Sequence, residues 1–266
     1  MYSLFALVGR GFFTLAGYVG GISRLTYNCT YWVLVAPFRG KGLRWYASVR
    51  QMVVVGFNAV PIVSLISCFI GLIVALQGAY SLRAFGALNY VVNMVAVIIT
   101  RELGPLLTAI IVIGRSGSSF AAEIGTMKVG EEVDALETMG LNPVRFLVVP
   151  RYLAMLIMLP CLTTVADTAG ILGGALFAMV SLGWSLQNYL SRTVDALVMR
   201  DIVSGLFKSI VFAVIITKIG CYEGFSVQGG AEGVGKSTTA SVVKSIFSVI
   251  AADMIFTAIF YYGSEG

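Results

Sequence analysis

The sequence predicts an all-α membrane protein with about five membrane-spanning helices, and both composition and charge spacing favour this class. Hydrophobic residues make up 58% of the 266 residues and charged residues only 12%, about half the charged share of soluble domains. No charged residue lies between Arg50 and Arg83, or between Asp167 and Arg192. Apolar stretches of about 18 residues or more are typical of membrane-spanning helices. The composition therefore excludes a water-soluble domain.

The first 50 residues are predicted to form N-terminal interfacial helices, which we separate from a five-span domain at 51–266. Their apolar pieces, GFFTLAGYVGGI and YWVLVAPF, are too short to cross a bilayer easily. Apolar helices flanked by basic residues are typical of the headgroup region. A poorly ordered basic tail is the alternative, and the aromatic content argues against it. The basic residues of this region, which contains no acid, are Arg10, Arg24, Arg39, Lys41, Arg44 and Arg50.

Five apolar stretches follow the interfacial region. The second is interrupted by the sequence RELGP, and the third contains Pro160 and Asp167. A proline inside a helix removes a backbone hydrogen bond and bends or breaks the helix. The third stretch is therefore either one kinked helix or two short passes. The expected spans are about 54–80, 88–113, 147–183, 198–220 and 239–262.

The distribution of basic residues orients these spans. With the N-terminus in the cytoplasm, the regions on that side, 1–50, 114–151 and 218–236, hold twelve Lys and Arg residues. The outer loops hold three, and membrane proteins concentrate basic residues on the cytoplasmic side. The C-terminus is then expected outside. The net charge of +5 is explained by this bias and does not indicate nucleic-acid binding.

The polar segment between the second and third spans is predicted to be a coupling helix at about 121–140. On a helix, Val129, Val133 and Leu136 form one apolar stripe, and acidic residues lie opposite. Anionic lipid repels an acidic helix, so a basic groove on another protein is the expected partner. A solvated helix without a partner is the alternative. The acidic residues are Glu123, Glu131, Glu132, Asp134 and Glu137.

Charged residues inside the second span are candidates for function. An ionised side chain at the bilayer centre costs about 2.5–3.5 kcal/mol, so such residues usually face a protein interior or a wet cavity. Arg101 and Glu102 are the strongest candidates, and an Arg–Glu pair or a pair with Asp167 that only locks helices together is the alternative. Lys208 and Asp253 are expected to pair or to reach towards the membrane surface.

A phosphate-binding motif near the C-terminus is predicted to be accidental. Gly230–Ser237 satisfies G-x-x-x-x-G-K-[ST], but this pattern binds phosphate only between a strand and a helix. The preceding residues, IGCYEGFSVQG, leave a membrane span instead of forming a strand. We expect the glycines to form a tight turn and Ser237 or Thr238 to cap the next helix. Histidine is absent and the four cysteines are scattered, so no metal site is expected.

Several segments together resemble the MlaE (YrbE) permease family of ABC transporters. They are FIGLIVALQG, then TRELGPLLTAIIVIGRSGSSFAAEIGTMKVGEEVDALETMGLNPVRFLVVPR, and then GAEGVGKSTTASVV. The resemblance runs from about residue 45 to the C-terminus. Family members often have GVGRATT where this chain has GVGKSTT, so two substitutions create the apparent phosphate-binding motif.

The resemblance implies a non-catalytic, homodimeric permease subunit in the inner membrane of a bacterium, with phospholipid or a related lipid as substrate. A separate cytoplasmic ATPase, which binds ATP and Mg, would contact the 121–140 helix. A periplasmic Mce-domain hexamer and a STAS-domain protein are further expected partners, and the transport would support outer-membrane lipid asymmetry. By position, the resemblance places Val74, Gln77, Leu82, Phe85, Arg101 and Glu102 around the lipid.

Two other function classes make different predictions. A nucleotide hydrolase using Gly230–Ser237 would bind and hydrolyse nucleotide without a partner. An ion-coupled carrier using Arg101, Glu102 and Asp167 would work without an ATPase, although the sequence shows no inverted repeats of the kind found in many carriers.

Overall fold

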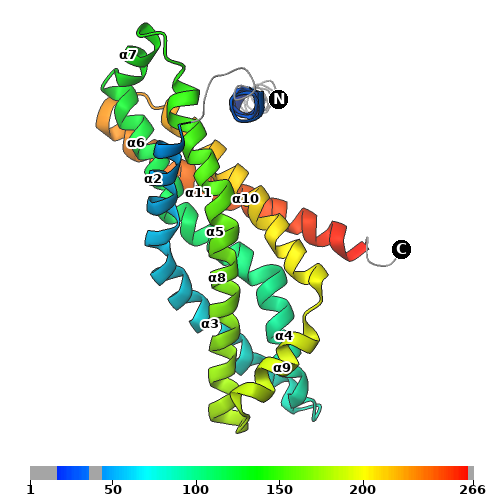
Figure 1. Cartoon of the computed structure of the whole chain (residues 1–266). Helices are drawn as coiled ribbons and strands as arrows, with labels where there is room; N and C mark the ends of the chain where they lie inside the picture. The colour runs from blue at the N-terminus through cyan, green and yellow to red at the C-terminus, as the bar shows by residue number, and fades with distance from the viewer. Residues whose placement is uncertain (1–16, 36–43, 263–266) are drawn as a thin grey trace, which may run out of the picture.

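The computed structural model describes residues 17–35 and 44–262, and these residues are almost entirely helical. Within them, five helical segments are long and apolar enough to cross a membrane, which confirms the predicted fold class. Figure 1 shows the helix α7 at one end of the bundle and the helix α9 at the other. The five segments are Trp45–Arg83, Leu88–Val129, Val144–Leu182, Met199–Phe225 and Gly230–Tyr262.

The first span begins before the predicted domain boundary. Helix α2 covers Trp45–Val55, so a division at residue 50 falls inside it. Arg115 donates hydrogen bonds to the carbonyls of Val54 (2.9 Å) and Val55 (3.4 Å), and so satisfies acceptors at the end of α2. A short helical turn, η3 (Phe57–Ala59), leads into α3 (Val60–Arg83). Of the interfacial region, residues 17–35 are helical, with η1 at Tyr31–Val35, and residues 1–16 and 36–43 lie outside the described part.

The second span is much longer than predicted. It runs without a loop to Val129, past the expected end at residue 113, and two π-helical turns interrupt it. Such turns are frequent at functional sites, and the first contains Arg101 and Glu102. Its parts are η4 (Leu88–Tyr90), α4 (Val91–Ile98), η5 (Ile99–Leu103), α5 (Gly104–Val112), η6 (Ile113–Gly117) and α6 (Ser118–Val129).

The segment predicted as one helix over 121–140 is two helices. The first, α6, ends at Val129, and α7 covers Glu132–Thr138. Glu131 has a φ of 59°, a left-handed conformation that an α-helix cannot contain. The predicted apolar stripe is therefore broken: Val133 and Leu136 are buried, whereas Val129 is 43% exposed.

The third span is a single helix, which decides the alternative that the sequence left open. After η7 (Val144–Val148), α8 runs from Val149 to Leu182 with Pro160 inside it. Gly170 and Gly173 let the α8 backbone approach α3 closely. A Cβ at Gly173 would overlap the Cys68 carbonyl of α3, and a Cβ at Gly170 would crowd the Ile99 side chain of η5. These small residues pack α8 and α3 together, the contact that glycines permit in membranes.

The last part of the chain contains an element that the sequence analysis missed and a helix that begins earlier than predicted. The missed element is α9 (Leu186–Ala196), whose Tyr189 is buried beside α4 and α8. It precedes α10 (Met199–Phe225). The next helix, α11 (Gly230–Tyr262), includes the whole Gly230–Ser237 motif, so the motif is not a loop.

The connection to α11 lies at 226–229 and ends in positive φ angles at Gly229 and Gly230. The predicted cap is absent: the Ser237 hydroxyl donates to the Glu223 carbonyl, and the Thr238 hydroxyl donates to the Val234 carbonyl. Both backbone carbonyls therefore accept from side chains within packed helices.

Candidate functional site

A buried lysine in α10 joins three membrane-spanning segments. The Lys208 side chain is fully buried and forms ion pairs with Glu102 of η5 and with Asp253 of α11, the latter at 2.9 Å. Its ammonium group also donates to the Thr257 hydroxyl at 2.9 Å, and Thr257 donates in turn to Glu102. We call Glu102, Lys208, Asp253 and Thr257 the Lys208 cluster. One buried cation thus lies between two carboxylates at the contact of three spans.

Arg101 lies beside this cluster but does not join it. Its guanidinium is 4.0 Å from the Asp201 carboxylate, near the start of α10. The Asp201 carboxylate also accepts from the Val198 amide at 3.4 Å. The alternative pairings weighed from the sequence are both wrong: Arg101 does not pair with Glu102, and neither residue pairs with Asp167. The Asp167 Oδ1 atom has no hydrogen-bond partner and packs close to Gly104.

The Arg101 and Glu102 side chains are partly exposed although they lie within a membrane span. Their exposed fractions are 32% and 28%. Contact of ionised groups with lipid tails is costly, so in the membrane this exposed side must face water, a second protein or a polar ligand. The two residues therefore mark a side of the bundle that is not lipid-facing.

The six residues predicted to line a lipid site fall into three groups in the single chain. Val74 and Leu82 are partly buried in an apolar cluster of α3, α4, η5 and α8. Gln77 and Phe85 are exposed, with Phe85 at 82% in the turn after α3. Arg101 and Glu102 make their ion pairs with α10 instead. None of five pockets in the described part of the chain is lined by any of the six.

Several members of the site were not predicted from the sequence. Asp201 and Thr257 were missed because an acid near the end of a span and a threonine within one are common in membrane helices. Lys208 and Asp253 were expected to pair or to reach the membrane surface, and the structure shows that they pair. The feature of the sequence that indicated Lys208 and Asp253 is a charged residue inside an apolar stretch.

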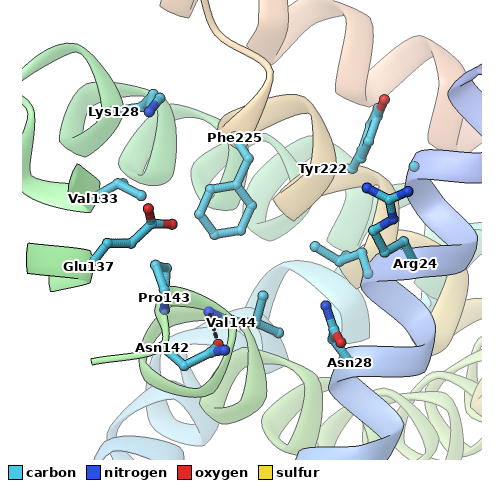
Figure 2. Close-up of a pocket in the computed structure, with 12 residues that line it drawn as sticks. Arg24, Asn28, Lys128, Val133, Glu137, Asn142, Pro143, Val144, Tyr222 and Phe225 are labelled. Carbon is cyan, nitrogen blue, oxygen red and sulfur yellow. Dashed lines mark hydrogen bonds between the residues drawn. The ribbon is translucent and has the colours of Figure 1, made fainter. Parts of the chain in front are cut away.

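The α7 end contains a second set of charged residues and a pocket of about 450 Å³. The pocket lies between the N-terminal helical residues, α6, α7 and the end of α10, and Figure 2 shows Glu137, Val133 and Phe225 directed into it. Arg24 and Lys128 also line it. Among the predicted acidic residues, Asp134 pairs with Lys128 at 2.6 Å.

Glu123 differs from the other four acidic residues because a buried arginine already holds it. The Arg151 guanidinium is 2.6 Å from the Glu123 carboxylate and donates to the Leu147 carbonyl at 2.7 Å. Glu131, Glu132 and Glu137 are exposed around α7. Four of the five acids therefore lie at the junction of α6 and α7, which we call the α6–α7 corner, and Glu123 joins α6 to α8.

A third ion pair attaches α11 to α10 at the same end. Lys244 of α11 is 2.7 Å from the buried Glu223 carboxylate. Its ammonium group lies 4.4 Å from the centre of the Tyr18 ring, and the Tyr18 ring packs edge-on against Tyr222. Burial, followed by the Glu223 charge, raises the pKa of the Tyr18 hydroxyl, so Tyr18 stays neutral. The N-terminal helix is thereby fixed to both α10 and α11.

Comparison with known proteins agrees with this architecture. The model of the Permease MlaE family matches residues 48–259, which is most of the chain. The chain belongs to the MlaE permease family. A probable ABC transporter permease protein of Rickettsia typhi is 41% identical over 212 residues, covering 80% of this chain and 82% of the relative. This MlaE-family chain is accordingly an ABC transporter permease.

Two other relatives extend the comparison. A probable ABC transporter permease protein of Rickettsia conorii is 35% identical over 263 residues, which are 98% of this chain and 99% of the relative. Protein TRIGALACTOSYLDIACYLGLYCEROL 1, chloroplastic, of Arabidopsis thaliana is 35% identical over 232 residues, covering 87% of this chain and 66% of that protein.

Proposed function

We propose that this MlaE-family permease moves phospholipid or a related glycerolipid, driven by a separate ATPase subunit. The observation that carries the proposal is the partial exposure of Arg101 and Glu102 at membrane depth. A phospholipid needs an apolar path for its chains and a polar place for its headgroup. Roughly thirty methylenes at about 0.8 kcal/mol each would make a watery path cost on the order of 25 kcal/mol. The plant relative named for trigalactosyldiacylglycerol supports a lipid substrate.

The proposed lipid site lies between two copies of the chain. Only 11% of the most apolar part of α11 is buried, and Phe247, Ile250 and Met254 are all about half exposed or more. A second copy seated against α11 would cover this surface and enclose the exposed side of Arg101 and Glu102. Arg101 would then contact the lipid phosphate, and apolar residues such as Val74, Leu82 and Phe85 would contact the acyl chains.

The ATPase is proposed to bind the α6–α7 corner. Glu131, Glu132, Asp134 and Glu137 give this corner a negative surface that suits a basic groove, and electrostatic complementarity favours correct docking. Movement of α6 would be transmitted to the Lys208 cluster, because α6 and η5 belong to the same span, Leu88–Val129, which contains no loop. ATP hydrolysis in the partner could then change the lipid site without any nucleotide bound to this chain.

The remaining features of the proposal follow from the charge distribution and the family. The α7 end is placed in the cytoplasm because twelve Lys and Arg residues lie on that side, and the C-terminus outside. A bacterial inner membrane, a periplasmic Mce-domain hexamer at the α9 end and a STAS-domain protein complete the assembly. The lipid would pass between the membrane and the Mce-domain protein.

The test is transport of a fluorescent phospholipid in vesicles that contain this chain with its ATPase subunit. Replacement of Arg101 or Glu102 by glutamine should lower ATP-dependent transport at unchanged protein level and unchanged ATPase binding. Charge reversal of Glu131, Glu132, Asp134 and Glu137 together should instead abolish ATPase binding. Normal transport by Arg101→Gln and Glu102→Gln would refute the site, and transport by the chain alone under an ion gradient would indicate a carrier.

A further inference from the structure

Asp167, in the middle of α8, is a carboxyl group that the proposed function does not use. Its Oδ1 atom is buried and has no hydrogen-bond partner among the described residues. The ion pairs of those residues all lie elsewhere. An ionised carboxylate in an apolar environment is very costly unless it is paired and hydrogen-bonded, so a group in such a position takes its neutral form. Asp167 is therefore a carboxylic acid whose contribution must come from its contacts.

The Asp167 carboxyl packs directly on the backbone of Gly104, where η5 passes into α5. A Cβ built on Gly104 would overlap the Asp167 Oδ1 atom and would lie 3.0 Å from the Asp167 Cγ atom. The carboxyl thus occupies the space that a side chain at position 104 would need. The Gly104 amide donates to the Ile99 carbonyl and so closes the π-helical turn η5. Asp167 therefore contacts the backbone at the residue that closes this turn.

The gap beside this contact excludes water. It lies between α3, η5, α5 and α8, which pack together (Figure 1), and it is too small to admit a water molecule. Ser67 of α3 and Ala166 of α8 line it together with Gly104. The Ser67 hydroxyl is buried and, like Asp167 Oδ1, has no hydrogen-bond partner. On this side the acid and the turn are therefore joined by direct packing and not through water.

The η5 turn depends on contacts of this kind from its neighbours. Pro105 follows the turn and has no backbone N–H, so it cannot add a hydrogen bond to it. A second contact comes from α10, because a Cβ at Gly205 would overlap the Thr100 carbonyl oxygen. The backbone of η5 is thus packed against Asp167 of α8 and against Gly205 of α10.

The register of η5 determines where Arg101 and Glu102 point. A π-helical turn contains one residue more than an α-helical turn, and successive residues of an α-helix are about 100° apart. Loss of the extra residue would rotate both side chains by about 100° relative to α5. Arg101 would then leave Asp201, and Glu102 would leave Lys208, which are their partners in the structure.

We propose that Asp167 is a positioning residue for the lipid site. Its carboxyl, packed on Gly104, holds η5 in the register that presents Arg101 and Glu102 to the ligand. This role rests on the proposed function, because it concerns the same site. The acid acts through its shape and its contact with the backbone, without carrying an ion.

The contact itself is tested by stability, without any transport assay. Gly104→Ala should lower the melting temperature of the purified chain by several degrees, because the added methyl group overlaps the carboxyl. In an Asp167→Ala background the same methyl group enters the space that the carboxyl has left, so the further loss should be clearly smaller. Gly114→Ala is the matched control on the same span, since nothing lies within 4 Å of a Cβ there. It should have the same effect in both backgrounds.

The positioning role is tested by ATP-dependent phospholipid transport in vesicles that contain the ATPase subunit, at equal protein level. Asp167→Ala should lower transport about tenfold or more, because misplacement of a functional group by about 1 Å can cost about a hundredfold in rate. Asp167→Asn has nearly the same shape without an ionisable group and should retain most of the transport. If Asp167 acts through Arg101, adding Asp167→Ala to Arg101→Gln should cause little further loss, whereas a merely structural role would give additive losses.

Each part of the proposal has its own contrary result. Equal losses from Gly104→Ala in both backgrounds would overturn the contact. Normal transport by Asp167→Ala, or losses that add to those of Arg101→Gln, would overturn the positioning role. Equal loss in Asp167→Asn and Asp167→Ala would overturn the action of a neutral acid through its shape. Failure of the proposed function looks different: Arg101→Gln would transport normally while the stability coupling between positions 104 and 167 persisted.

Discussion

Helices α8 and α11 have 34 and 33 residues, yet their neighbours bury them to very different extents. Of the most apolar 18 residues, 56% are buried in the span that contains α8 and 11% in α11. Around α8, Gly170 and Gly173 allow close backbone contact with α3, and Leu159, Leu162 and Ala166 belong to the main apolar core. Close packing of many atoms is therefore what holds α8.

The helix α11 packs against α10 and α6 on one side only, and buried polar contacts add to that packing. Asp253 and Thr257 contact the Lys208 ammonium group, and Lys244 contacts Glu223. Many of its apolar side chains are exposed in the single chain, including Val243, Phe247, Ile250 and Met254. The bundle therefore contains one helix, α8, that is packed on most sides, and one, α11, that is packed on one side and tied to α10 by ion pairs. A helix of the second kind can change its position when a charge is neutralised or a partner binds, which suits a transporter subunit.

The largest expected effect follows from removing the cation of the Lys208 cluster. In Lys208→Met, Glu102 and Asp253 remain as two carboxylates without their cation. Breaking a buried ion pair costs about 3–5 kcal/mol, so we expect a large fall in thermal stability and loosening of α11. The measurement is the melting temperature together with the labelling rate of a cysteine introduced at Ser248.

The matched control for that change is Lys244→Met, which removes the cation of the other ion pair between α10 and α11. The Lys244 side chain is 44% exposed, so water replaces part of the lost interaction and the effect should be clearly smaller. If both variants labelled and melted alike, burial of the cation would not be what holds α11. A double variant, Lys208→Met with Asp253→Asn, should recover part of the stability, because one uncompensated carboxylate is removed.

A smaller loss is expected from adding a methyl group between α3 and α8. A Cβ at Gly173 would overlap the Cys68 carbonyl, whereas nothing lies within 4 Å of a Cβ at Gly235 on α11. Gly173→Ala should therefore lower stability by about 1–3 kcal/mol through overpacking. Gly235→Ala should be neutral or slightly stabilising, since alanine favours helix more than glycine. Chemical unfolding of both variants measures the difference, and similar losses would show that packing holds the two helices alike.

The sequence predicted what depends on composition and charge, and missed what depends on geometry. The five spans follow from the apolar runs, because an apolar stretch of sufficient length is typical of a membrane-spanning helix. The family follows from the resemblance that includes the RELGP block. The end of the second span was placed at residue 113 because the polar residues after it predict a loop. The structure continues the helix to Val129, since small residues such as Gly117 and Gly125 pack it against α10 and α11.

The candidate site shows the same limit. A charge inside an apolar run identified Arg101, Glu102, Lys208 and Asp253, but the pairing between them depends on which helix faces meet. Thr257 carries no such signal, because threonine is common in membrane helices. The corner at Glu131 was missed because a left-handed residue that is not glycine is uncommon, and nothing in the acidic pattern marks it.

The smallest expected effect concerns Lys236, the lysine of the apparent phosphate-binding motif. Its side chain is 77% exposed and pairs with Glu232 one turn earlier on α11, and exposed pairs of this kind contribute little to stability. In Lys236→Ala, we expect unchanged folding, unchanged ATPase binding and unchanged ATP turnover by the assembled transporter. The backbone amides of a true phosphate loop point at the ligand, whereas those after the first turn of α11 are used within the helix. Loss of ATP turnover in Lys236→Ala, measured at equal amounts of assembled complex, would contradict the assignment of this segment as an ordinary helix start. It would also remove the contrast between the buried ion pair of Asp253 with Lys208 of α10, on which the position of α11 depends, and the exposed charges of α11, on which it does not.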